Sequence, residues 1–155
     1  MQFTNYFFSS VISFSGLLAG ILLIRIAPEE QKPLERYMVL LKRFLLSLIF
    51  VFAAFYYFNS WFYILILAAY FAFLLFAEYK IRDLYRKVML AYAVFGILFF
   101  LSSKNPNLFA IESSLIMLYG LPTASLMYNK KEKNHYKLIF LNLGFIIIAN
   151  ALFFT

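Results

Sequence analysis

The chain has 155 residues, of which 65% are hydrophobic and only 14% are charged, and its net charge is +7. A soluble domain carries about 25% charged residues and leaves much of its surface in water, so this composition excludes a soluble globular fold and predicts a membrane protein. The basic excess would favour nucleic-acid binding in a soluble protein, but here we attribute it to loops beside a lipid bilayer and expect no nucleic-acid partner.

Six long apolar blocks follow one another along the chain, and each approaches the roughly 20 residues that cross the hydrocarbon core of a membrane. Their apolar runs are continuous, which favours helices over barrel strands, because only a helix satisfies its backbone within one segment. The fold class that we predict is therefore an all-α membrane protein, a six-transmembrane-helix bundle of three hairpins forming one polytopic domain over residues 1–155. The expected helices cover residues 6–27, 37–58, 62–79, 86–101, 108–128 and 138–154.

The first charged stretch, RIAPEEQKPLERY (residues 25–37), is interpreted as a connector between two spans. Pro28 is expected to end the first helix, and Pro33 to open the second, since proline is tolerated in a first turn. Glu29 and Glu30 would be costly in hydrocarbon, so they are expected at the membrane surface. An acidic functional site in this connector is the alternative.

The basic residues predict the orientation of the bundle. All of them except Lys104 lie in or beside the first, third and fifth connections. The positive-inside rule then places these connections in the cytoplasm and both termini outside. Residue usage and short loops favour a prokaryotic plasma membrane. We expect Lys42 to extend from an early turn of the second helix to the membrane surface.

Small residues form a stripe on the first expected helix. Ser9, Ser13, Gly16 and Gly20 follow the spacing of one helical face, and GLLAG is a GxxxG sequence. Small side chains let a second helix approach closely in lipid. We expect this stripe to pack against another helix of the same chain, with self-association as the alternative.

The fifth expected helix carries the main candidate for a binding site. Glu112 shares a helical face with Tyr119 and Thr123, and a carboxylate within a membrane is a candidate proton or cation site. The alternative is a cap at the headgroups, where a negative charge favours the helix start, and the marginal depth of Glu112 favours this cap. In the sixth helix, Asn142 and Asn150 are expected mainly to hydrogen-bond between helices, with Asn142 a further candidate for ligand contact.

No catalytic motif is present, and we predict no catalytic residue, no metal and no cofactor. The chain lacks cysteine and has one histidine, His135, which excludes thiolate chemistry and a multi-histidine metal site in a monomer. Acidic residues near the basic connections could in principle hold Mg²⁺, although their spacing matches no known signature. These are Glu29, Glu30, Glu35, Glu78, Asp83 and Glu132.

These observations leave three functional hypotheses. The first is a non-enzymatic accessory or assembly subunit of a larger membrane complex. The partners expected for the chain are the lipid bilayer and either another membrane protein or a second copy of the chain. The alternative is a small transporter or channel that uses Glu112, Tyr119, Thr123 and Asn142. A lipid-modifying enzyme that uses the acidic connections is the third. In length and expected helix number the chain is similar in outline to the small substrate-binding subunits of vitamin transporters, but it matches no binding motif of theirs.

Overall fold

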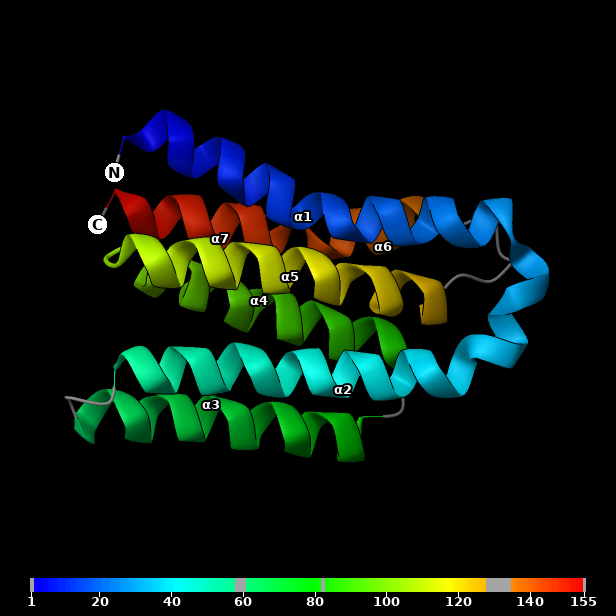
Figure 1. Cartoon of the computed structure of the whole chain (residues 1–155), viewed down its shortest axis with the longest axis horizontal. Helices are drawn as coiled ribbons and strands as arrows, with labels where there is room; N and C mark the ends of the chain where they lie inside the picture. The colour runs from blue at the N-terminus through cyan, green and yellow to red at the C-terminus, as the bar shows by residue number, and fades with distance from the viewer. Residues whose placement is uncertain (1, 58–60, 82, 128–134, 155) are drawn as a thin grey trace.

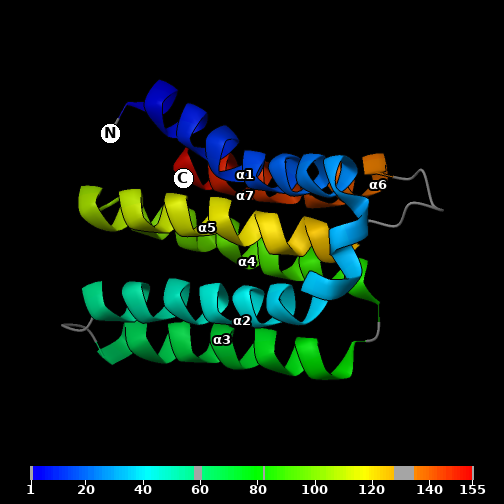
Figure 2. The same cartoon turned by 45° about the vertical axis from the view of Figure 1, so that its right-hand side comes forward.

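The computed structural model describes the chain apart from residues 1, 58–60, 82, 128–134 and 155, and apart from the side chains of Tyr63, Glu78 and His135. The described residues are helical and contain no strand, as predicted. The helices run up and down in three layers: α1 beside α6 and α7, α4 beside α5, and α2 beside α3 (Figures 1 and 2). Both termini lie at the same end of the bundle (Figure 1).

The helix boundaries follow the predicted blocks, with differences at two places. The elements are α1 (Phe3–Ile26), the 3₁₀ turn η1 (Pro28–Glu30), α2 (Gln31–Tyr56), α3 (Trp61–Lys80), α4 (Leu84–Ser102), α5 (Pro106–Met127), α6 (His135–Asn142) and α7 (Gly144–Phe153). Residues 59 and 60, between the second and third predicted helices, lie outside the described residues, as does the basic connection that includes Glu132.

Five of the described helical segments are long and apolar enough to cross a membrane. They are α1, η1 with α2, α4, α5, and α6 with α7 over Tyr136–Phe153. The sixth predicted span corresponds to α3, whose apolar stretch Ile64–Ala77 is shorter. Large apolar side chains such as Phe55 and Ile147 are exposed on the outside of the bundle. This surface is compatible with a membrane protein, because lipid does not penalise it as water would.

The second helix begins at Gln31, two residues before Pro33, which was expected to open it, and six residues before the predicted apolar block at 37. Gln31 opens α2, so the charged residues up to Arg36 are helical rather than a loop. Pro33 lies in the first turn, where its missing N–H is not needed. The start of α2 crosses the end of the bundle (light blue in Figure 1), which keeps these charges away from the apolar core.

The last predicted helix is broken at Leu143 into α6 and α7. The Leu143 N–H is shared between the carbonyl oxygens of Ile139 and Phe140, at 3.1 and 3.3 Å. The amide of Asn142 donates to the carbonyl oxygen of Leu138 at 2.7 Å, a local bond that competes with regular helix geometry. Gly144 follows directly and weakens the helix further. The local hydrogen bond of Asn142 and the low helix propensity of Gly144 together explain the break at Leu143.

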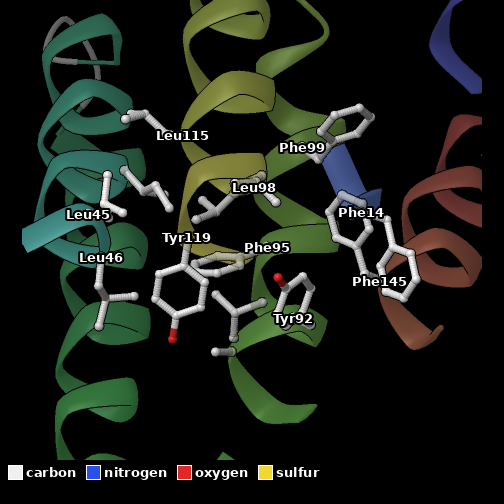
Figure 3. Packing of buried hydrophobic residues seen from close by; sticks show 14 of the residues in the cluster. Phe14, Leu45, Leu46, Tyr92, Phe95, Leu98, Phe99, Leu115, Tyr119 and Phe145 are labelled. Carbon is white, nitrogen blue, oxygen red and sulfur yellow. The ribbon is translucent and has the colours of Figure 1, made fainter. Parts of the chain in front are cut away.

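Helix α5 is the centre of the bundle and packs most extensively against α1 and α2, while α4 packs mainly against α7. Aromatic rings pack where α4 faces α5 and α7, while leucine side chains lie between α2 and α5 (Figure 3). Tyr119 of α5 meets Phe95 of α4 edge to face, with ring centroids 4.9 Å apart, and Tyr92 contacts Tyr119 at 6.1 Å. Such contacts add to the area that the rings bury, and they fix α5 relative to α4.

Candidate functional site

Glu112 lies inside the bundle, on the buried face of α5. Its side chain is fully buried, and neither carboxylate oxygen has a hydrogen-bond partner among the described residues. Phe109 and Ile116, one turn to either side on the same helix, are also buried. The ring of Phe109 packs against Tyr6 of α1 and Phe99 of α4. The residues one turn to either side of Glu112 on this buried face are therefore aromatic and aliphatic.

The capping alternative for Glu112 is wrong. Helix α5 begins at Pro106, six residues before Glu112, which places the carboxyl about 9 Å along the helix axis. Asn105 caps this end instead: its Oδ1 accepts hydrogen bonds from the backbone N–H groups of Asn107 and Leu108, at 3.0 and 3.3 Å. An asparagine at this position satisfies the donors that a helix start leaves open.

Tyr119 and Thr123 continue the polar face of α5 toward the basic end of the bundle. Both side chains are buried, and Thr123 Oγ1 has no hydrogen-bond partner among the described residues. The helical rise separates Glu112 from Tyr119 by about 10 Å and from Thr123 by about 16 Å along the axis. A single small ion cannot contact all three side chains. They form a column rather than one binding site.

Lys42 of α2 lies beside the same column of polar side chains. The sequence analysis did not predict this position. It is only 5% exposed, and its Nζ lies 6.0 Å from the centre of the Tyr119 ring, a cation–π distance. The expectation that Lys42 extends to the membrane surface is wrong, because its side chain is buried inside the bundle beside Tyr119. The signal was present in the sequence: Lys42, Leu45, Leu46 and Ile49 follow the spacing of one buried helical face.

Tyr92 of α4 is a second polar group in this region that sequence reasoning did not select. Its side chain is fully buried, and its hydroxyl has no hydrogen-bond partner among the described residues. Figure 3 shows its ring between Phe95 and the α7 side of the core, within reach of Tyr119. Its spacing from Phe95 and Phe99 on α4 marks it as a core position.

The two asparagines of the C-terminal segment differ in what they contact. Asn142 is buried and bonds within α6, and its Oδ1 has no partner among the described residues. Asn150 donates across the bundle to Ser10 Oγ of α1 at 3.1 Å. Beside it, the Tyr6 hydroxyl donates to the Ala149 carbonyl oxygen at 2.9 Å. The interhelical role that the sequence predicted therefore belongs to Asn150, with Tyr6 as its neighbour.

The small-residue stripe of α1 lies against α5. A Cβ atom on Gly16 would overlap the backbone carbonyl oxygen of Met117, and one on Gly20 would come within 2.5 Å of the carbonyl oxygen of Leu121. Gly120 completes the contact from α5, because its Cβ would lie 2.5 Å from the Leu17 nitrogen. Ser13 is buried at the same interface, while Ser9 is half-buried beside it. The two backbones touch along this line.

The acidic residues near the basic connections do not converge in the described part of the chain, where no group of three or more acidic or histidine side chains forms a cluster. Asp83 instead stabilises the start of α4, because its carboxylate accepts from the Tyr85 N–H at 2.9 Å and lies 3.6 Å from Arg86. Comparisons of the chain with protein-family models, with curated proteins and with solved structures gave no match. Function is therefore argued from the residues of the bundle alone.

Proposed function

We propose that the chain is a small polytopic membrane protein that moves protons across its membrane, with Glu112 as the group that binds the proton. The carboxyl of Glu112, buried and without a partner among the described residues, carries this proposal. Acidic side chains within a membrane are expensive and are typical of ion pathways and proton relays. A proton needs one oxygen, whereas a metal cation needs several. A single carboxyl without a hydrogen-bond partner among the described residues therefore favours the proton.

The column of polar side chains supports a proton path that leads from Glu112 toward the basic end of the bundle. From Glu112 it continues through Tyr119, beside Lys42, to Thr123, and Met127 ends α5 about one turn further on. Chains of polar and ionisable side chains within a membrane are typical of proton relays. The positive-inside rule supports a cytoplasmic position for this end of the bundle and an outside position for both termini. A prokaryotic plasma membrane remains our proposal for the location.

Replacing Glu112 by glutamine tests the proposal. Liposomes that contain the purified full-length protein and a trapped pH-sensitive dye are given a proton gradient, and its decay is recorded. We expect the protein to speed the decay, and Glu112→Gln to reduce this effect at least about tenfold because the amide cannot release a proton. Glu30→Gln, the same change at an exposed position of η1, serves as the control and should leave the rate unchanged. Equal decay with Glu112→Gln and the unchanged protein would contradict the proposal.

An accessory or assembly subunit of a membrane complex is the second candidate. It is favoured by α3, which packs against α2 and α4 less extensively than the central helices pack against one another. A groove of about 330 Å³ between α2 and α3 is lined almost entirely by apolar side chains, among them Phe50, Leu67 and Phe71. A partner helix could pack there. The Gly16–Gly20 stripe offers less support, because α5 of the same chain already covers it.

Mass spectrometry of the protein extracted gently from its own membrane separates the two candidates. A protein bound in fixed stoichiometry is the result expected for the subunit hypothesis. A monomer or a homo-oligomer without another protein would contradict that hypothesis and leave proton movement as the function to examine.

A further inference from the structure

A polar cavity lies at the basic end of the bundle, and none of the Glu112 column residues lines it. It measures about 220 Å³ and opens where the end of α1, the start of α2 and the end of α5 meet. Its lining contains the polar residues Gln31, Lys32, Glu35 and Ser125. It also contains the apolar residues Ile24, Leu34, Met38 and Leu126. The cavity therefore offers both polar groups and apolar surface to a ligand.

A hydrogen bond joins two of the helices that line this cavity, α2 and α5. The side-chain amide of Gln31 donates to the backbone carbonyl oxygen of Ser125 at 2.9 Å, joining the start of α2 to the last turn of α5. This bond uses a carbonyl oxygen that a helix end leaves open. Because the crossing segment of α2 is held against α5, the cavity exists before any ligand arrives.

The charges around the cavity favour an anion. A second hollow, of about 470 Å³, continues along α2 and shares Lys32 and Glu35 with the cavity. Its wall adds Arg36 and Arg43, so three basic side chains face one acidic side chain. Lys32 and Arg36 are exposed and form no ion pair with a described carboxylate. Val39 and Leu40 separate the basic residues with apolar surface.

We propose that this cavity and hollow bind the headgroup of an anionic phospholipid. Lys32 and Arg36 would contact the phosphate, for which the guanidinium fork of arginine is well suited. Glu35 would accept a hydrogen bond from a hydroxyl of the headgroup, which favours phosphatidylglycerol-type lipids. The apolar side chains would lie against the glycerol and acyl chains. Basic pockets between helices at a membrane surface bind such headgroups.

The proposal goes beyond proton movement and rests on one part of the proposed function, the position of this helix end at a membrane surface. It does not depend on Glu112. The position of Val39 and Leu40 between the charges argues for a lipid rather than a free phosphate ion, since a free ion gains nothing from apolar surface.

Retention of lipid by the purified full-length protein tests the proposal. The protein is incubated with equal amounts of phosphatidylglycerol and phosphatidylcholine, and bound lipid is read by native mass spectrometry. We expect phosphatidylglycerol to be retained preferentially. The double variant Lys32→Gln and Arg36→Gln should lower its affinity about 30-fold, because each basic residue near an anionic surface contributes about 1 kcal/mol, or about fivefold. Both side chains are exposed, so the helical circular dichroism should be unchanged.

A second double variant, Lys80→Gln and Lys137→Gln, removes two exposed charges from the same end of the bundle and should retain the lipid. Equal losses in the two double variants, or no preference for phosphatidylglycerol, would overturn the proposal. Displacement of the lipid by inorganic phosphate at equal concentration would show a phosphate site and overturn it as well. The Lys32 and Arg36 variant should keep its proton movement, so failure here is distinguishable from failure of the Glu112 proposal.

Discussion

Replacing Gly16 by alanine is expected to lower the free energy of unfolding by about 3 kcal/mol, at the upper end of the usual cost of overpacking. The new Cβ would overlap the carbonyl oxygen of Met117, which belongs to a helix backbone and cannot rotate away. Helix α1 would have to move off α5. That movement would also open the contacts of Gly20 and Gly120, which lie on the same line. The loss is measured by titrating the protein in mild detergent with a denaturing detergent and following helical circular dichroism.

The matched control for this experiment is Gly144→Ala. A Cβ on Gly144 would meet no atom within 4 Å. The substitution should therefore be neutral or stabilise the protein by at most about 1 kcal/mol, through the better helix propensity of alanine. Similar stabilities for the two variants would show that α1 and α5 are not in backbone contact. A larger loss of stability for Gly16→Ala than for Gly144→Ala would show that the small-residue stripe packs within one chain.

The helical fold was predictable because hydrophobicity dominates it. Runs of about 20 apolar residues leave helices as the only way to satisfy the backbone in lipid, and their spacing along the chain indicated the order of the elements. The predicted helix boundaries were wrong where charged residues or local hydrogen bonds determine the start or the end of a helix. Helix α2 starts at Gln31 because its charged first turns cross the end of the bundle, outside the apolar layer. An apolarity pattern cannot show such a path, since it places every charged segment outside a helix.

The candidate site was predictable only in part, since burial in a membrane bundle depends on neighbouring helices rather than on one helix. Glu112, Tyr119 and Thr123 share a face that the sequence could show. Whether that face meets lipid headgroups or other helices depends on α1, α2 and α4 packing around α5. Lys42 could have been found from the helical period of α2, whose hydrophobic residues surround it on one face. The spacing of Tyr92 from Phe95 and Phe99 indicates a core position, but the sequence could not show that its hydroxyl has no hydrogen-bond partner among the described residues.

Replacing Glu112 by methionine is expected to raise the free energy of unfolding by about 2 kcal/mol, within the range of about 1–3 kcal/mol that an unpaired buried polar group costs. Methionine has a similar length and flexibility but no polar atom that needs a hydrogen bond. The native carboxyl is buried without a partner in the described residues. The same detergent titration measures this gain. Glu30→Met, at an exposed position of η1, should change stability by less than about 0.5 kcal/mol.

The expected rise in the free energy of unfolding distinguishes a carboxyl that serves proton movement from one that stabilises the fold. A side chain that holds the bundle together would lower stability when replaced, as we expect for Gly16. A carboxyl kept for proton movement would instead be a local cost that the rest of the packing tolerates, and its loss would stabilise the fold while stopping the activity. If Glu112→Met unfolds more easily than the unchanged protein, the carboxyl has a structural partner and its isolation no longer supports proton movement. A Glu112→Met variant that is more stable and no longer dissipates a proton gradient would support the proposal. The buried carboxyl would then account both for the lower stability of the unchanged protein and for its proton movement.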